Sequence, residues 1–503
     1  MAAPITGSAQ AGGGGKTDGG TTIVLLLAFA VFFILGGVTN INDLLVGKFK
    51  PMFQLSHAEA NLVQMAFFIA YALVSIPAGI VMSRLGYIRT FVLGFMMVAA
   101  AALLFVPASA SASYGGFLAA LFFIGAGITV LQVAMNPIIT TLGPPETAHS
   151  RLTFAQAFNS IGVFLMVYGG ATVLLGGETH FDAAGATPEA IKAYQVEQGA
   201  SIGNAYFWLA VVMLGIAAVF WAFRRSLDHA KAEKAQVAGT LDLLKSNRRV
   251  QLGALGIFTY VGAEVAIGSN LIAYLGDQRT MGLGLEAAGK LVAYYWLGAL
   301  IGRLAGGFIL RTSLAKMPLV VLSLLGVGTV LVNAMLNPSW GAFGAVFGLS
   351  AVLYGVFFIL NRLEKHFEIA QGQAVPPGRI LTVFAVGAIG LIALSAVSTG
   401  ALAGWALVAV GLCNSLMFPT IFSLGTEGLG EQTPQGSGIM CTAIVGGAII
   451  PVAFGLVADF SHDLRFALIV PAVCYLFIAA FGIWAVNNPS KAKGEGSTGP
   501  VFE

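Results

Sequence analysis

The feature that most constrains this chain is a long series of apolar segments, each about 20 residues in length. About 20 apolar residues in a helix, at about 1.5 Å per residue, cross the hydrocarbon core of a bilayer. Six such segments precede a charged stretch at 224–249, and eight follow it. We predict membrane helices at 22–46, 57–82, 89–108, 115–141, 151–176, 201–223, 250–276, 285–311, 317–336, 341–361, 379–398, 401–424, 435–459 and 465–488.

The composition excludes several classes of protein. Of 503 residues, 57% are hydrophobic and 9% are charged, whereas a soluble domain carries about a quarter charged residues. Outer-membrane barrels have alternating strands of about 10 residues, which these runs do not resemble. The 65 glycines favour close helix packing in a membrane. The net charge of +3 gives no reason to expect nucleic acid as a partner. No pattern typical of a catalytic or metal site is present, so we expect no enzyme activity and no cofactor.

The distribution of lysine and arginine predicts the orientation. With the N-terminus inside, the inside loops and tails hold 18 of these residues and the outside loops hold 6. Cytoplasmic loops are enriched in Lys and Arg, so we expect both termini in the cytoplasm. The segment 177–200 is then a long outside loop.

Two internal similarities indicate a repeat. Residues 132–143 (QVAMNPIITTLG) match residues 414–425 (NSLMFPTIFSLG) at five of twelve positions, with an offset of 282. Residues 78–82 resemble residues 306–310, with an offset of 228. The difference of 54 residues equals about two helices with their loops. We therefore predict two six-helix halves and an inserted helix pair within about 312–378, which gives about fourteen transmembrane helices.

The predicted organisation follows from these repeats. A flexible tail occupies 1–20, the N-terminal half 21–223, a cytoplasmic linker 224–249, the C-terminal half 250–488 and a second tail 489–503. We expect the inserted pair, 317–336 and 341–361, to pack outside the twelve-helix core.

Two acidic residues lie well within predicted helices, Asp43 in the first and Glu264 in the seventh. Ionisable groups inside a membrane are costly and usually functional. We expect both residues to take part in coupling to an ion. Two structural interpretations stay open: Asp43 caps a helix near the outer interface, or Glu264 makes a hydrogen bond to a neighbouring helix.

Amide side chains form a second candidate set. Amides both donate and accept hydrogen bonds, as a neutral sugar requires. Their alternative role is to hold membrane helices together. The predicted substrate-binding amides are Asn40, Gln132, Asn136, Gln156, Asn159 and Asn414.

Charged residues near the inner helix ends are candidates for an inner gate formed by ion pairs. They are Arg84, Glu146, Arg151, Arg303 and Glu427. The alternative is that they anchor the helices at the interface, with their charged groups reaching toward water.

Four stretches resemble the fucose–proton symporter family of the major facilitator superfamily. They are 39–43 (TNIND), 132–145, 151–162 (RLTFAQAFNSIG) and 418–425 (FPTIFSLG). Residues 260–269 (YVGAEVAIGS) are more similar to the glucose/galactose transporter branch of that family.

The resemblance implies an all-α polytopic protein of the bacterial inner membrane that imports a sugar by symport. Asp43 matches the acid of the family's first helix. Gln132 replaces a glutamate of the fucose permeases, and Glu264 stands where they have glutamine, so Glu264 is a candidate to take over that role. Phe418 replaces a tyrosine and joins the expected substrate-binding residues.

We therefore expect a proton-coupled importer of a neutral hexose, such as glucose, galactose or an N-acetylhexosamine, working by alternating access. A sodium-coupled symporter is the first alternative, and a drug or lipid exporter is the second. The expected partners are a small sugar and membrane lipid, and we expect a monomer.

Overall fold

The computed structural model describes residues 19–141, 148–176, 185–222, 224, 240–309 and 376–489. Every regular element in these ranges is helical. Eleven of the described helical segments are long and apolar enough to cross a membrane. Helix α13 (Leu285–Ile309) adds a further 25-residue helix. The predicted all-α polytopic class is confirmed. The predicted helices at 317–336 and 341–361, and hence the position of the inserted pair, lie outside the described residues.

The N-terminal bundle contains the described helices between residues 19 and 222. Its elements are α1 (Gly19–Asn40), α2 (Asn42–Phe53), α3 (His57–Ala60), α4 (Leu62–Leu85), α5 (Tyr87–Leu103), α6 (Phe105–Ala110), α7 (Tyr114–Thr141), α8 (Ala148–Gly170), the π-helical turn η2 (Ala171–Leu175) and α9 (Pro188–Ala222).

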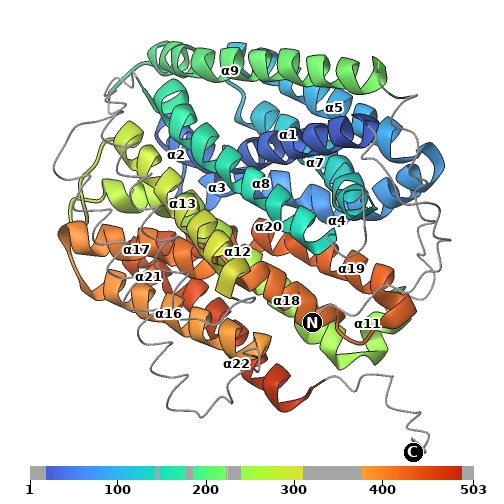
Figure 1. Ribbon diagram of the computed structural model, residues 1–503. Coiled ribbons are helices and arrows are strands. Elements are labelled where there is room, and N and C mark those ends of the chain that lie inside the picture. Colours follow the sequence, from blue (N-terminus) through green and yellow to red (C-terminus); the bar gives the residue numbers. More distant parts are fainter. Residues whose placement is uncertain are drawn as a thin grey trace, which may run out of the picture.

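The C-terminal bundle contains the described helices between residues 240 and 487. Besides α13, its elements are α11 (Thr240–Ser246), α12 (Arg248–Gly276), α16 (Pro377–Val397), α17 (Gly400–Asn414), α18 (Met417–Thr426), η3 (Gly430–Gln432), α19 (Thr433–Thr442), η4 (Ala443–Val445), α20 (Gly446–Ser461), α21 (Leu464–Ala467) and α22 (Ile469–Asn487). In Figure 1 the blue-to-green N-terminal bundle fills the upper part of the view, and the yellow-to-red C-terminal bundle fills most of the lower part.

Several predicted membrane segments are two helices in the structure. The first one divides at Ile41 into α1 and α2, and the one at 401–424 divides after Asn414 into α17 and α18. Ser56 and Glu59 form a capping box, with Ser56 Oγ accepting from the Glu59 N–H. This box opens the short helix α3 ahead of α4.

The predicted outside loop 177–200 is wrong over its second part, because α9 already begins at Pro188. The segment 188–200 is polar, so it carries no hydrophobic signal of a membrane helix. It is nevertheless rich in Ala, Glu, Gln and Lys, which are good helix formers. Pro188 suits the first position of a helix, where its missing N–H would have no partner.

Close contacts between glycines and backbone carbonyls recur in both bundles. A Cβ at Gly162 of α8 would lie less than 3.0 Å from the Phe33 carbonyl oxygen of α1. A Cβ at Gly446 of α20 would meet the Phe258 carbonyl of α12 in the same way. The two phenylalanines are 225 positions apart and the two glycines are 284 apart. These separations are close to the sequence offsets of 228 and 282, so the same packing is used in both bundles.

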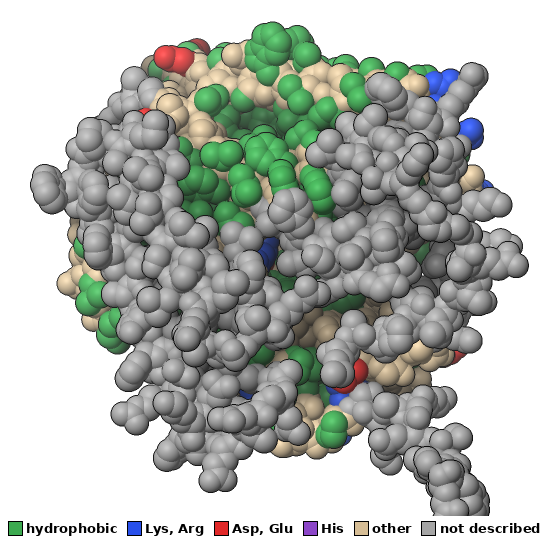
Figure 2. All heavy atoms as spheres, in the orientation of Figure 1, with side chains coloured by type: hydrophobic (Ala, Val, Ile, Leu, Met, Phe, Trp, Pro, Cys, Tyr) green, Lys and Arg blue, Asp and Glu red, His purple; other side chains and the backbone are tan. Residues whose placement is uncertain are grey.

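The two bundles meet along three main contacts. Helix α13 packs on α8, α12 packs on α2, and α20 packs on α3 and α4. The described helices expose many large apolar side chains, as expected where lipid is the solvent. Figure 2 shows few charged side chains on the described part of one face. Large side chains such as Trp208, Leu476 and Phe460 are exposed.

Candidate functional site

Asp43 lies where the two bundles meet. It is in the first turn of α2, and its side chain is almost completely buried, with 3% exposed. Its Oδ1 accepts from Gln64 Nε2 at 2.9 Å and from Ser269 Oγ at 2.8 Å. Its Oδ2 accepts from the indole Nε1 of Trp296 at 3.0 Å. The carboxylate is thus held by α4 of its own bundle and by α12 and α13 of the other.

The hydrogen-bond donors around Asp43 suit an ionised carboxylate, and one of them, Gln64, can also act as an acceptor. A buried carboxylate requires hydrogen-bond donors to replace water. The indole of Trp296 only donates, whereas the amide of Gln64 has both a donor and an acceptor end. Gln64 Oε1 is buried and has no hydrogen-bond partner. Rotation of this amide would therefore offer an acceptor to a protonated Asp43.

Glu264 lies in the middle of α12 and is also buried, with 8% exposed. Its Oε1 is 2.7 Å from the Tyr260 hydroxyl, one turn earlier on α12. The Tyr295 hydroxyl donates to the backbone carbonyl of Glu264 at 3.0 Å. Tyr260 also lies 2.9 Å from the backbone carbonyl of Asn414. The second acid therefore belongs to a tyrosine-rich network of the C-terminal bundle.

The predicted amides have different surroundings. Asn40 Nδ2 donates to the Gly36 carbonyl at 2.9 Å, and Asn159 Nδ2 donates across helices to the Phe32 carbonyl at 3.0 Å. Asn414 is buried, and its amide group is bound by two tyrosines: Nδ2 donates to the Tyr295 hydroxyl at 2.7 Å, and Oδ1 accepts from Tyr475 at 2.6 Å.

The remaining candidates for substrate binding lie on three helices. Gln132 of α7 is half-buried and hydrogen-bonds Tyr71 of α4. Gln156 of α8 is also half-buried. The half-buried Phe418 opens α18, with its ring centroid 6.1 Å from that of Tyr260. The side chain of Asn136 lies outside the described residues.

The candidate inner-gate residues are not brought together in the described part of the chain. Glu427 pairs with Arg249 at 2.6 Å within the C-terminal bundle. Arg303 Nη1 instead donates to Ser160 Oγ of α8 at 2.9 Å, which links the two bundles. Arg84 is exposed at the end of α4. Glu146 and the side chain of Arg151 lie outside the described residues.

A further contact between the bundles lies near α3. The Asp459 carboxylate of α20 accepts from the backbone N–H groups of His57 and Ala58, at 2.8 and 2.9 Å. Next to it, the amides of Asn61 and Asn270 donate to each other at 3.0 and 3.1 Å. The distribution of lysine and arginine predicts that this end of the bundles faces outside. These four hydrogen bonds join the two bundles at this end.

The environment of His57 lowers its pKa to about 4. Burial is the main cause, and the positive charge of Lys50 adds to it, while Asp459 acts in the opposite direction. His57 is therefore neutral near pH 7. The short helix α3 remains in contact with α20 without a second positive charge beside Lys50.

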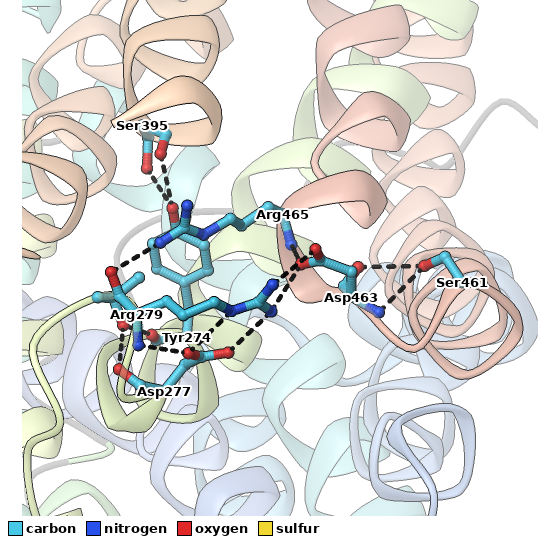
Figure 3. Close-up of polar contacts among 8 residues, drawn as sticks. Tyr274, Asp277, Arg279, Ser395, Ser461, Asp463 and Arg465 are labelled. Carbon is cyan, nitrogen blue, oxygen red and sulfur yellow. Dashed lines mark hydrogen bonds and ion pairs between the residues drawn. The ribbon is translucent and has the colours of Figure 1, made fainter. Parts of the chain in front are cut away.

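A cluster of four charged residues at the same end connects loops of the C-terminal bundle. Its members are Asp277, Arg279, Asp463 and Arg465. Figure 3 shows the Arg279 guanidinium between the carboxylates of Asp277 and Asp463. Arg465 donates to the Arg279 carbonyl at 2.7 Å. Burial raises the pKa of Asp277, but the hydrogen bonds and charge of Arg279 outweigh it and lower the pKa below its usual value. This cluster stabilises one bundle and does not join the two.

Sequence reasoning missed the partners of the two acids. Gln64 and Ser269 are ordinary polar residues in apolar runs, and only their approach to Asp43 in space marks them. Asp459 was missed because it stands near the end of a predicted helix, where solvated acids are common. Among the described residues, no group of three His, Cys, Asp or Glu side chains is placed to hold a metal ion.

Two buried acids lie at and beside the junction of two helical bundles, in a shell of apolar helices, which is the arrangement expected of a membrane transporter. The sequence pattern of the Major Facilitator Superfamily matches residues 21–363. The chain belongs to this superfamily.

Relatives of this chain are known sugar carriers. The glucose/galactose transporter of Brucella abortus is 35% identical over 90% of this chain and 92% of its own length. The L-fucose-proton symporter of Escherichia coli is 29% identical over 90% of each chain. Its solved structure in the outward conformation covers 93% of this chain and 99% of that chain, with a TM-score of 0.61 and 27% identity. The predicted family and its fold are thereby confirmed.

Proposed function

We propose that this chain imports a neutral hexose by symport with a proton. The proposed substrates are glucose, galactose or an N-acetylhexosamine. The similarity to a glucose/galactose transporter and to an L-fucose-proton symporter supports a sugar as the substrate. The second of these also supports the proton as the coupling ion.

The observation that carries this proposal is the position of Asp43. Its carboxylate accepts hydrogen bonds from both bundles. Alternating access moves the two bundles relative to each other, so an acid bound by both of them changes its partners during the cycle. A group that changes partners also changes its affinity for a proton. Glu264, which lies deeper in the C-terminal bundle, shares this role in our proposal.

The substrate site in this proposal is lined by Asn40, Gln132, Asn136, Gln156, Asn159, Asn414 and Phe418. Asn40, Asn159 and Asn414 already make hydrogen bonds within the protein. Sugar hydroxyls would compete for these bonds or add to them, since each amide has more than one donor and acceptor position. Gln132 and Gln156 are half-buried, as Asn40 and Asn159 are, whereas Asn414 is buried.

The proposal includes the arrangement in the membrane. Residues 21–223 and 250–488 are the two halves, and both termini face the cytoplasm of a bacterial cell. The inserted helices at 317–336 and 341–361 pack outside the core. Arg84, Glu146, Arg151, Arg303 and Glu427 control the inner side. The protein works as a monomer in contact with lipid.

Uptake into proteoliposomes tests the proposal. Purified full-length protein is reconstituted, and labelled glucose, galactose, N-acetylglucosamine and fucose are offered with an imposed proton gradient, a sodium gradient or neither. We expect accumulation of one of the first three sugars that requires the proton gradient and is abolished by a protonophore. Empty liposomes are the control. Accumulation driven by sodium alone would replace the proton with sodium, and extrusion of lipophilic cations without sugar uptake would favour an exporter.

A further inference from the structure

The hydroxyl group of Tyr260 lies between two hydrogen-bond acceptors. Glu264 Oε1 is 2.7 Å away and the backbone carbonyl oxygen of Asn414 is 2.9 Å away. All three groups are buried. A phenol has one hydrogen to donate, and it accepts through its oxygen. Tyr260 therefore cannot donate to both neighbours at the same time.

The protonation state of Glu264 decides which acceptor receives the hydrogen. An ionised carboxylate only accepts, so Tyr260 must donate to it, and the Asn414 carbonyl then lacks this donor. A protonated Glu264 can donate to the tyrosine oxygen, which frees the phenol hydrogen for the Asn414 carbonyl. Leaving a buried carbonyl without a donor is unfavourable. The Asn414 carbonyl thus has its hydrogen bond from Tyr260 when Glu264 is protonated and lacks it when Glu264 is ionised.

Asn414 stands at a break between two helices. It is the last residue of α17, and α18 begins at Met417 after the turn at 415–416. The carbonyls of the last helical turn have no partner further along their own helix and depend on other donors. The Asn414 side chain is held at both ends, by Tyr295 and by Tyr475. A change at its carbonyl therefore acts on the turn that joins α17 to α18, because the side chain is fixed.

We propose that Tyr260 is a positioning residue that transmits the protonation state of Glu264 to the α17–α18 turn. With Glu264 protonated, Tyr260 holds the Asn414 carbonyl and the turn keeps one geometry. With Glu264 ionised, the carbonyl is released and α18 changes its angle to α17. Phe418, in the first turn of α18, moves with it. The inference rests on the proposed function only in giving Glu264 a proton to exchange.

The charged and titratable groups that face this network come from several helices. The charged groups that act on Glu264 are Arg303 of α13 and Asp43 of α2. The tyrosines around it are Tyr260 on α12, Tyr295 on α13 and Tyr475 on α22. Each tyrosine has a hydroxyl to donate but remains neutral near pH 7, so Glu264 is the member of the tyrosine network that titrates.

A distance measurement along α17 and α18 tests the inference. Spin labels are placed at the exposed positions Leu402 of α17 and Ser423 of α18 in the full-length chain, with Cys413, Cys441 and Cys474 replaced by alanine. Distances are measured by pulsed electron paramagnetic resonance in lipid nanodiscs without sugar, between pH 5 and 9. We expect the distance distribution to shift with pH. A matched pair at Glu197 and Val219 of the unbroken helix α9 should not shift.

Three variants identify the group that transmits the change. Tyr260→Phe should lose the pH-dependent shift, because neither acceptor has its donor at any pH. Tyr274→Phe removes an equally buried hydroxyl from the same helix, which donates to the Ser395 carbonyl and not to Asn414, and it should retain the shift. Glu264→Gln should hold the low-pH distribution at every pH, because the new amide donates to Tyr260 as the protonated acid does.

The outcomes separate this inference from the proposed function. The inference is overturned by a wild-type shift that persists in Tyr260→Phe, by its loss in Tyr274→Phe as well, or by its absence in the wild type. Glu264→Gln gives an independent result if Tyr260→Phe fails to fold. Sugar uptake is measured separately on the same preparations. A chain that shows the Tyr260-dependent shift but accumulates no sugar retains the inference and loses the proposed function.

Discussion

Trp296 of α13 and Asp43 of α2 belong to different bundles and share a hydrogen bond of 3.0 Å. The indole N–H can only donate, and it forms this bond to one of the two carboxylate oxygens. Ser269 of α12 adds a second donor from the same bundle as Trp296. Asp43, a residue of the N-terminal bundle, thus receives most of its hydrogen bonds from the C-terminal bundle. Separating the bundles at this point would remove two of its three donors.

We predict that Asp43→Asn abolishes uphill sugar uptake and retains exchange of sugar down its gradient. The amide is close in size to the carboxylate but cannot take up and release a proton. Counterflow of labelled sugar in proteoliposomes measures exchange, and accumulation under a proton gradient measures coupling. Asp463→Asn is the matched control, because Asp463 lies in the charged cluster of one bundle. Proton-driven accumulation in Asp43→Asn at the wild-type level would remove this acid from the coupling mechanism.

The helices of the core were predictable because each hydrophobic run is long and a helix is the stable way to cross a bilayer. The two acids were predictable because an ionisable group in such a run is rare. The hydrogen-bond partners of these acids were not predictable. Gln64 and Trp296 are 21 and 253 residues from Asp43 in the sequence. No periodicity within one helix encodes the approach of another helix, so these contacts required the three-dimensional arrangement.

Helix breaks and helical extensions were the other features that the sequence did not reveal. The division after Asn414 occurs inside a continuous apolar run. Hydropathy measures the affinity for lipid and is insensitive to a local change in backbone direction. Likewise, the first turns of α9 are polar and helical, and only their helix-forming residues hint at this structure.

We predict that Gln132→Ala weakens sugar binding about 2- to 12-fold, since the loss of one hydrogen bond costs about 0.5–1.5 kcal/mol. Gln132 is half-buried on α7, and its hydrogen bond to Tyr71 of α4 directs its side chain into its own bundle. Equilibrium binding of labelled sugar measures the effect. Asn204→Ala, an exposed amide on α9, is the control and should bind like the wild type. Equal affinity in both variants would contradict a sugar contact at Gln132.

We predict that His57 contributes to the loss of stability in acid. Its pKa is lowered from 6.5 to about 4 in the folded protein, so the unfolded state binds the proton more readily. Stability from this group is complete above pH 6.5 and is lost as the pH falls toward 4. His57→Gln should therefore flatten the decrease in melting temperature over this range. The exposed His462→Gln is the control, and an unchanged pH dependence in His57→Gln would refute the prediction.

We predict that Asp459→Ala opens the end of the molecule near α3. The Asp459 carboxylate accepts two backbone N–H groups at the start of α3, where a negative charge is also favoured by the helix dipole. Spin labels at the exposed positions Gln54 and Phe460 lie on the two sides of this contact. Their distance should increase in Asp459→Ala.

Asp463→Ala provides the control for this experiment. Asp463 lies a few residues further along the chain, but it binds Arg279 within the C-terminal bundle. Its loss should leave the Gln54–Phe460 distance unchanged. The same lengthening in both variants would show that any lost acid at this end loosens the structure, and it would exclude a specific link between the bundles.

We predict that Gly162→Ala destabilises the protein and that Gly169→Ala, on the same helix, does not. At Gly162 a Cβ would lie less than 3.0 Å from the backbone carbonyl of Phe33, which cannot rotate away as a side chain can. Helices α1 and α8 must move apart, and overpacking of this kind costs about 1–3 kcal/mol. At Gly169 a Cβ meets nothing within 4 Å, and alanine is the better helix former by about 1 kcal/mol. Melting temperatures in detergent should therefore fall for Gly162→Ala and stay level or rise for Gly169→Ala. Equal melting temperatures for the two variants would mean that α1 and α8 do not approach as closely as described.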